Sequence, residues 1–334
     1  MRRKNSSPLK RWIKGVLILL IAGCTCSCEK EELPVPKHDA GDVITNSISM
    51  ESDYRFQLFF DLETNTMVKK NLKTDWDLGF ETTPSGFHII LNTAKAMFSA
   101  NTLQANFTAI TDTIGLDFTW DEASGHLDST AIKDWTGTQN VYIIDRGFNE
   151  LGTHLGFKKI IFQSVNSTDY SVRFANLDGT NDVTYQVAKD EIYNFAFLSL
   201  NGNGSIVSIQ PPKEDWDIVF TQYINIFYDE NPALPYLVTG CITNRNKVEV
   251  AQVFDKDFVA MTLNDVGSYS FSSNINTIGY DWKFYDFGTG QFTVFTNQNY
   301  IIKSTEGKYY KLHFIDFYDN FGNKGTPTFE FQEL

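Results

Sequence analysis

Cysteine and histidine are scarce in this 334-residue chain, which contains four cysteines and five histidines. Three of the cysteines cluster near the N-terminus, so Cys241 is the only thiol in the rest of the sequence. No framework of disulfide bonds can therefore hold the fold together. The sequence also lacks GxSxG, HExxH and CxxC motifs, and its histidines are too few to nominate a catalytic triad. These absences predict a protein that is not an enzyme.

Positive charge is also in short supply. The chain carries 28 basic and 41 acidic residues, a net charge of −13, and six of the basic residues lie between Arg2 and Lys14. Without that segment, 22 basic residues face 41 acidic ones, a net charge of about −19. Such a surface repels nucleic acid and anionic lipid, so neither is expected as a partner.

The basic N-terminus is followed by an apolar run, residues 15–23, which is too short to cross a bilayer as a helix. This order of segments is typical of an export signal, and we assign residues 1–23 to a signal peptide. The acidic, proline-containing segment 24–41 then forms a tether, and the folded part begins near residue 42.

Two cysteines at this junction are candidates for lipidation. Residues 21–24 (IAGC) resemble a bacterial lipobox, and Cys24 fits the rule of small residues before the cleavage site. Cys28 directly precedes the acidic run 29–32, which resembles the signal that sends Bacteroidetes lipoproteins to the outer face of the outer membrane. Either cysteine would place the protein on the outer membrane, attached only by lipid and facing the cell exterior.

The most distinctive feature of the remaining sequence is repetition. Residues 73–80 (KTDWDLGF) return as residues 213–220 (KEDWDIVF), and an aromatic run precedes each copy. Two further blocks recur downstream in the same order, at residues 142–144 with 157–162 and at residues 300–302 with 309–314. The repetition predicts two β units, residues 42–189 and 190–334, packed as one continuous domain or as two adjoining ones.

Alternating apolar and polar residues are frequent, and helical periodicity is hard to find. We therefore predict an all-β fold of antiparallel sheets or a sandwich, internally duplicated and with little helix. The Asp178-Gly179 pair is typical of a hairpin turn, although its acidic neighbours superficially suggest a calcium loop. A hairpin loop spans Asp145 to Gly156 in the first copy and is longer than its counterpart, so function is expected there.

Several motifs together resemble the HmuY-like lipoproteins of Bacteroidetes. They are the two DWDΦxF copies, the strand 236–240 (YLVTG), and the C-terminal runs 307–318 and 325–331. The resemblance implies an all-β lipoprotein anchored in the outer membrane, without catalysis. It also implies haem as the ligand, captured at the cell surface and handed to a TonB-dependent receptor.

The resemblance further implies axial haem ligands, two histidines or two methionines near the WD motif. The second motif is followed by residues 220–227, which contain neither, whereas the first is followed by His88 and Met97. His154 in the long hairpin loop can join them, so these three residues are the candidate haem ligands. Each has a structural alternative: a hydrogen-bonded His88, a Met97 that fills the core, and a solvated His154.

The sequence also predicts the positions of several other residues. Lys95 and Arg146 are expected to be available to haem propionates, and His126 belongs to a polar insertion. His313 is expected at the surface of its strand. Trp76 and Trp216, flanked by aspartates, are expected in the core, as is Cys241.

The missing ligands near the second motif leave a second function open. In that alternative the haem site has been lost, and the protein is an adhesin or accessory subunit. It would bind a glycan or a protein partner through exposed tyrosine and tryptophan side chains.

Overall fold

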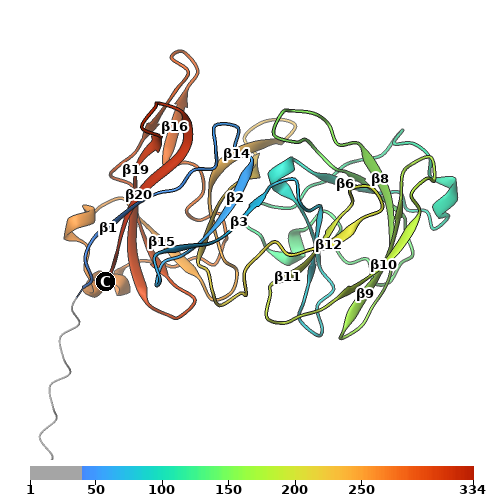
Figure 1. Ribbon diagram of the computed structural model, residues 1–334, viewed down its shortest axis with the longest axis horizontal. Coiled ribbons are helices and arrows are strands. Elements are labelled where there is room, and N and C mark those ends of the chain that lie inside the picture. The colour runs from blue at the N-terminus through green and yellow to red at the C-terminus, as the bar shows by residue number, and fades with distance from the viewer. Residues whose placement is uncertain (1–39) are drawn as a thin grey trace, which may run out of the picture. The chain divides into compact units, whose positions relative to one another are not determined.

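The computed structural model describes residues 40–334, shown in colour in Figure 1. The predicted signal peptide, both candidate lipidation cysteines and the tether up to residue 39 lie outside the described residues. These assignments stay predictions. Residues 40–334 together make up one structural unit.

The regular secondary structure of the described chain consists almost entirely of antiparallel strands, which confirms the all-β prediction. Its helical segments are short 3₁₀ turns: η1 (Thr93–Lys95), η2 (Phe107–Ala109), η3 (Leu127–Ser129), η4 (Phe258–Ala260) and η5 (Leu263–Ser268). Among the described residues, none of these helices has the length and apolar character needed to cross a membrane.

Two five-stranded sheets lie at opposite ends of the described part of the chain (Figure 1). One has the order β1 (Ile44–Ser47), β20 (Lys324–Glu333), β19 (Tyr309–Tyr318), β18 (Asn299–Lys303) and β15 (Glu249–Val253). The other has the order β10 (Val183–Ala188), β9 (Asp169–Ala175), β8 (Phe157–Val165), β7 (Tyr142–Asp145) and β6 (Phe98–Asn101). The predicted hairpins at Asp178-Gly179 and at residues 300–312 are therefore confirmed.

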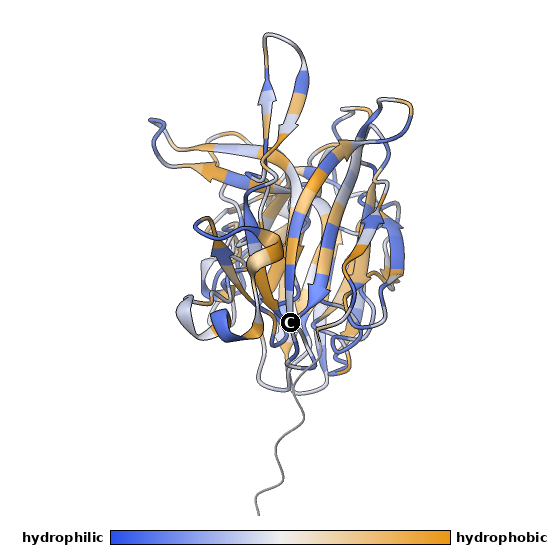
Figure 2. Ribbon diagram, turned by 90° about the vertical axis from the view of Figure 1, so that its left-hand side faces the viewer, coloured by the Kyte–Doolittle hydropathy of each residue, from blue (hydrophilic) through white to orange (hydrophobic). Residues whose placement is uncertain are grey.

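Two four-stranded sheets lie between them. The first has the order β12 (Ser205–Val207), β11 (Phe195–Ser199), β4 (Leu78–Glu81) and β5 (Ile89–Leu91). The second has the order β14 (Leu234–Thr243), β13 (Ile218–Phe227), β2 (Phe56–Asp61) and β3 (Thr66–Leu72). A separate hairpin, β16 (Lys283–Asp286) and β17 (Gln291–Val294), projects at the top of Figures 1 and 2.

The two sequence copies exchange strands in these four-stranded sheets. Strand β4 of the first copy pairs with β11 of the second, with Leu78 opposite Leu198. Strand β13 of the second copy pairs with β2 of the first, with Ile218 opposite Phe60. Each WD motif thus leads into a strand that pairs on one side with its own copy and on the other side with the other copy, and the predicted boundary at residues 189 and 190 is crossed by two sheets.

Equivalent hydrogen bonds hold the two WD motifs. The side-chain amide of Asn92 donates to the backbone carbonyl of Trp76 at 2.9 Å, and that of Asn244 donates to the carbonyl of Trp216 at 2.8 Å. Both asparagines are completely buried. A buried amide that satisfies backbone carbonyls fixes the turn before each strand, because the alternative is an unpaired polar group.

Apolar and polar side chains alternate along the strands, visible as orange and blue bands in Figure 2, and the apolar ones form the core. In β20, for example, Phe329 and Phe331 are buried and Glu330 between them is only partly covered. Cys241 is buried and has no disulfide partner among the described residues, as predicted. The remaining apolar side chains of the WD region form a smaller cluster between the copies, which lines the site described next.

Candidate functional site

A cavity of about 110 Å³ lies between strands of the two copies. Two aromatic pairs line it, and each pair joins a tryptophan of one copy to a phenylalanine of the other. Trp216 packs edge-on against Phe59 with ring centroids 4.9 Å apart, and Trp76 packs in the same way against Phe197 at 4.8 Å. The predicted burial of both tryptophans is confirmed, since 7% of Trp76 and 3% of Trp216 is exposed.

The two indole groups differ in their hydrogen bonds. Trp76 Nε1 donates to the side-chain oxygen of Gln57 at 2.9 Å. Trp216 Nε1 is buried and has no acceptor among the described residues. The second copy has the apolar run Phe195–Phe197 where the first has Phe56–Leu58, so no side chain there replaces the amide of Gln57.

A second polar atom without a partner belongs to another residue around the cavity. Gln210 also lines the cavity, and its Oε1 is buried with no donor among the described residues. Most buried polar atoms in folded proteins have a hydrogen-bond partner, so these two atoms are exceptions. One is a donor and the other is an acceptor.

Charged residues also line the cavity. Asp121 accepts hydrogen bonds from the backbone N–H groups of Leu91 and Ala131, at 2.7 and 2.8 Å, and burial raises its pKa to about 6. Arg245 donates to the carbonyl of Gly125, and burial lowers the pKa of its guanidinium to about 10, an effect that the charge of Asp121 opposes. The two charges partly compensate each other in a poorly solvated place.

The loop of residues 121–126 closes the cavity on the outside. Its carbonyl at Ser124 accepts a hydrogen bond from Ile275 N at 3.0 Å, and a Cβ on Gly125 would meet the Ile275 side chain at 2.6 Å. His126, at the end of this loop, is exposed and lines the cavity. A loop of the first copy therefore covers a site built from both copies. Sequence reasoning placed His126 only in a polar insertion, and no residue pattern indicated its position.

The volume of the cavity limits what it can hold. Pockets for drug-sized ligands measure about 300–1,000 Å³. At about 110 Å³ the cavity is too small to enclose a tetrapyrrole. The predicted haem ligands His88, Met97 and His154 do not line it.

His88 lies just before β5 and is held by carboxylates. Its Nδ1 is 2.6 Å from Glu81 Oε2, its Nε2 is 3.5 Å from Asp128 Oδ1, and its ring stacks on Phe87 at 4.1 Å. Asp128 is an exposed side chain, so the Nε2 side of the imidazole is the one open to a ligand.

Met97 lies in the apolar core next to β6. None of its surface is exposed, and it packs in the cluster that includes Leu91, Ile144 and Phe162. Its thioether is therefore covered on all sides in this conformation.

His154 lies in the long hairpin loop between β7 and β8, and it is exposed. Its Nε2 is 2.8 Å from Asp145 Oδ1, and its ring lies 5.2 Å from that of Phe148 and 5.1 Å from that of Phe157. Phe148 and Leu151 of the same loop are 43% and 76% exposed. The loop thus presents an imidazole beside apolar side chains at the surface.

Lys95 and Arg146 are not available to propionates, and this expectation was wrong. Both contact Asp77 of the first WD motif: Lys95 Nζ lies 2.5 Å and Arg146 Nε 3.0 Å from Asp77 Oδ1. Burial alone would raise the pKa of Asp77, but the two cations outweigh it and hold that pKa below its usual value. Lys95 and Asp77 are completely buried. Moving either cation away from Asp77 would therefore leave charge in the core without its partner.

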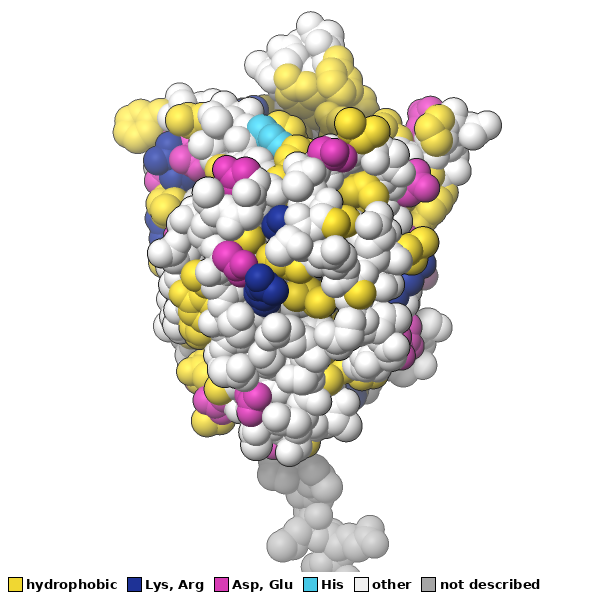
Figure 3. All heavy atoms as spheres, turned by 90° about the vertical axis from the view of Figure 1, so that its right-hand side faces the viewer, with side chains coloured by type: hydrophobic (Ala, Val, Ile, Leu, Met, Phe, Trp, Pro, Cys, Tyr) yellow, Lys and Arg dark blue, Asp and Glu magenta, His cyan; other side chains and the backbone are white. Residues whose placement is uncertain are grey.

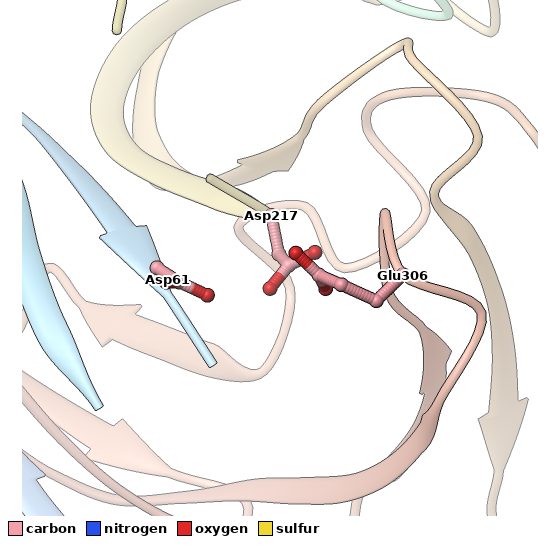
Figure 4. Close-up of side chains that lie close together, drawn as sticks. All are labelled: Asp61, Asp217 and Glu306. Atoms are coloured by element: carbon pink, nitrogen blue, oxygen red, sulfur yellow. The ribbon is translucent and has the colours of Figure 1, made fainter. Parts of the chain in front are cut away.

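The equivalent aspartate of the second WD motif has acidic neighbours instead of basic ones. Asp217 lies beside Asp61 and Glu306, with carboxylate oxygens of all three within 4.8 Å of one another (Figure 4). Backbone N–H groups of Leu62 and Thr305 donate to Asp217 at 3.0 and 2.9 Å. Burial, reinforced by the neighbouring carboxylates, raises the pKa of Asp217 to about 6. Oxygen ligands at this spacing are the type that a hard divalent cation accepts.

His313 is buried, which corrects the expected surface position. Its ring stacks on Phe258 with centroids 4.1 Å apart, and its Nε2 lies 3.0 Å from Glu330 Oε2. The 3₁₀ helix η4 covers this face of β19, so the polar face of the strand is enclosed.

The face of the molecule over β8 and β10 offers no concentrated charge. Figure 3 shows acidic and basic side chains scattered there among apolar and neutral groups. A face of this kind gives no electrostatic attraction to a strongly charged polymer, in agreement with the acidic composition.

Comparison with known proteins places the chain in a family. The family model described as HmuY protein matches residues 53–331. No curated protein matches the sequence.

Among solved structures, apo PinO from Porphyromonas gingivitis has a TM-score of 0.35 and 10% identity, and the match covers 88% of this chain and 98% of that chain. The apo HmuY analog from Tannerella forsythia has a TM-score of 0.25 and 9% identity, with coverage of 89% and 98%. The family match spans both WD motifs and most of the described residues. The chain belongs to the HmuY family.

Proposed function

We propose that this protein binds haem or a related tetrapyrrole without catalysis, captures it at the cell surface and delivers it to a TonB-dependent receptor. The observation that carries the proposal is the family match over residues 53–331. In this proposal the lipid on Cys24 or Cys28 anchors the chain in the outer membrane, facing the exterior.

We assign the first haem contact to His154. Its Nε2 is oriented by Asp145, and no described residue makes a hydrogen bond to its Nδ1. A carboxylate that holds one ring nitrogen fixes the tautomer and leaves the other nitrogen for a metal, as is common among metal-binding histidines. Phe148 and Leu151 beside it supply apolar surface for the porphyrin face.

His88 and Met97 remain the other proposed ligands. His88 must exchange its contact with the exposed Asp128 for iron, which costs little because that contact is solvated. Met97 must first leave the core, so it ligates only if haem binding moves the segment around η1. The proposal therefore ranks His154 first, His88 second and Met97 third.

An absorbance titration of residues 29–334 with ferric and ferrous haem tests the proposal. We expect a saturable, one-to-one shift of the Soret band in the wild type. His154→Ala should weaken the affinity at least tenfold, which corresponds to about 1.4 kcal/mol. His126→Ala is the matched control, because His126 is also exposed but lies on a different loop. A spectrum of free haem, or equal affinity in both variants, contradicts the assignment.

A second function, binding of a protein partner with the haem site lost, is favoured by one observation. Phe287 in the turn of the projecting β16–β17 hairpin is 83% exposed, and Phe321 in the β19–β20 turn is 91% exposed. Large exposed aromatic side chains are frequent anchors of protein interfaces. Under this alternative, capture from an outer-membrane extract should return one specific partner, and Phe287→Ser with Phe321→Ser should abolish that capture. Capture unaffected by these changes would exclude the hairpin as the contact.

A further inference from the structure

The carboxylate cluster of the second WD motif has three members from three elements. Asp61 ends β2, Asp217 directly precedes β13, and Glu306 lies in the turn between β18 and β19 (Figure 4). Asp61 and Asp217 are buried, whereas Glu306 is exposed. None of the described lysine, arginine or histidine side chains forms an ion pair with any of the three. Like charges at this spacing repel each other, so the cluster requires a source of positive charge.

The lysine that neutralises the first WD motif has a counterpart with a different contact in the second copy. Lys95 lies three positions after the asparagine that holds the first motif, and Lys247 lies three positions after the asparagine that holds the second. Lys95 is buried against Asp77, but Lys247 is exposed and pairs with Glu214 at 2.7 Å. The ammonium group that the first copy directs to its aspartate is therefore directed to the surface in the second.

The arginine of the first site has no basic counterpart at all. Arg146 lies two positions after the repeated block 142–144, and Ser304 lies two positions after the matching block 300–302. Ser304 is completely buried and carries no charge. Two positions further on, Glu306 adds a carboxylate to the site. The second copy has thus lost both internal cations at the place where it has gained negative charge.

A buried hydroxyl group beside the cluster provides an independent observation. Tyr310 is 3% exposed and packs in the same core cluster as the residues that directly follow Asp61 and Asp217. Burial raises the pKa of its phenol most, and the charges of Asp217 and Glu306 are among those that raise it further, so the hydroxyl lies near these carboxylates. Yet it has no hydrogen-bond partner among the described residues.

The cluster oxygens therefore converge on one another although a donor is close by. Buried carboxylates usually accept from such a donor, and a cation between them explains why these do not. The cation is held by the carboxylates, so it does not need to reach the hydroxyl of Tyr310.

The spacing and type of the oxygens favour calcium. One ion can bind a set of oxygens only if no two lie farther apart than twice the metal–oxygen distance, which is about 5 Å for calcium and about 4 Å for magnesium. The cluster oxygens lie within 4.8 Å of one another and meet the calcium limit. Calcium also accepts irregular sets of carboxylates and waters, whereas magnesium demands a nearly ideal octahedron.

We propose that Asp61, Asp217 and Glu306 bind one divalent cation, calcium in preference to magnesium. The ion neutralises the second WD motif, as Lys95 and Arg146 neutralise the first. Water completes its coordination on the exposed side, at Glu306. Because Asp61 belongs to the first copy and the other two ligands to the second, the ion joins the copies where β2 pairs with β13.

Calorimetry of the protein of residues 29–334 tests the proposal. The protein is freed of metal with a chelator and titrated with calcium chloride or magnesium chloride at pH 7.5, above the pKa of about 6 of Asp217. Sodium chloride keeps the ionic strength equal, so that screening does not differ between the two titrations. We expect one calcium ion per chain, bound at least tenfold more tightly than magnesium, and a Tm that rises with calcium concentration.

Variants of the cluster separate ligation from charge repulsion. Glu306→Gln alters an exposed side chain, so the fold should persist, and it should weaken calcium at least tenfold. In chelator this variant should have a higher Tm than the wild type, because one repelling charge is gone, and in calcium the order should reverse. Glu230→Gln removes one exposed charge elsewhere and should leave calcium affinity unchanged. Asp61→Asn should weaken calcium as Glu306→Gln does.

Four results overturn the proposal. Absence of calcium binding means that protons alone relieve the cluster. Equal affinity for magnesium, or an equal loss in Glu230→Gln, means that calcium responds only to the acidic surface. An unchanged order of Tm in chelator and in calcium means that Glu306 only repels its neighbours. Neither haem nor His154 takes part in these measurements, so their failure is distinguishable from failure of the proposed haem function.

Discussion

Asp77 and Asp217 occupy the same position in the two WD motifs and have surroundings of opposite charge. Asp77 is neutralised by Lys95 and Arg146, whereas Asp217 lies beside Asp61 and Glu306. Both carboxylates are completely buried. Each also accepts a backbone hydrogen bond from the leucine that directly follows an exchanged strand, Leu200 after β11 for Asp77 and Leu62 after β2 for Asp217. The two aspartates therefore share the same backbone arrangement, although the charges around them differ.

Removing the negative charge of Asp77 should be severely destabilising. Asp77→Asn leaves the ammonium of Lys95 fully buried without a counter-charge. Loss of one partner from a buried ion pair costs about 3–5 kcal/mol, and we expect a decrease of this size in the free energy of unfolding by urea. The control is Asp215→Asn in the second motif, whose exposed side chain should change stability by less than about 0.5 kcal/mol. Similar stabilities of the two variants would show that the buried pair contributes little.

The carboxylate cluster should make stability fall as the pH rises from about 4 to about 6. The pKa of Asp217 is raised to about 6, above its value in the unfolded chain, so in this range the folded state keeps a proton that the unfolded state has lost. Above about pH 6 Asp217 is ionised in the folded state too, so the free energy of unfolding stays lowered by the full cost of ionising this buried carboxyl. Glu306→Gln removes one repelling charge and should stabilise the protein at pH 7 by about 0.5 kcal/mol, and not at all below pH 4.

Urea unfolding at pH 3.5, 5 and 7 measures this dependence. Glu230→Gln is the control, because Glu230 is an exposed glutamate in the loop between β13 and β14. A gain from Glu306→Gln that is equal at all three pH values would mean that Asp217 does not cause it.

The two tryptophans should respond differently to the same substitution. Trp76→Phe loses a satisfied hydrogen bond to Gln57, whereas Trp216→Phe removes a buried N–H that has no acceptor among the described residues. Both lose similar packing, so the difference isolates the polar group. We expect Trp76→Phe to cost about 1 kcal/mol more than Trp216→Phe in thermal or urea unfolding. A larger cost for Trp216→Phe would reveal an acceptor, such as ordered water, in the ligand-free protein.

Much of the local structure could be predicted from the sequence. The repeated motifs, the turn at Asp178-Gly179 and the long loop from Asp145 to Gly156 follow from local residue patterns, and the structure has them in place. The unsatisfied indole of Trp216 also had a signal, because the first copy has Gln57 in a run that is wholly apolar in the second.

Other features depend on tertiary contacts that the sequence does not record. The alternation that placed Lys311 and His313 on one face of a strand was right, but nothing in that strand indicates that η4 covers the face. Lys311 Nζ donates to the carbonyls of Phe258 and Met261, which is how its charge is accommodated inside. In the same way, Lys95 and Arg146 look like free cations until the fold brings Asp77 to them.

Strand exchange is the feature that sequence reasoning could least predict. Because the two copies carry the same pattern, β2 fits β4 of its own copy and β13 of the other equally well by periodicity. The structure pairs β2 with β13 and β4 with β11, so each copy completes a sheet of its neighbour.

This exchange predicts how the chain behaves when it is divided between its copies. A fragment of residues 40–189 lacks β11, the partner of β4, and a fragment of residues 190–334 lacks β2, the partner of β13. Each fragment leaves open sheet edges and an exposed apolar cluster, so we expect both to be unfolded or aggregated alone. Expressed together, they should assemble into a one-to-one complex whose NMR spectrum resembles that of the intact protein.

A protein cut instead in the exposed turn between β16 and β17 should stay folded, because that cut separates no exchanged strands. A well-dispersed NMR spectrum from residues 40–189 alone, or from residues 190–334 alone, would contradict the prediction that neither fragment folds by itself. It would mean that strands can close within one copy, and that the two copies are independent domains which exchange strands only when joined.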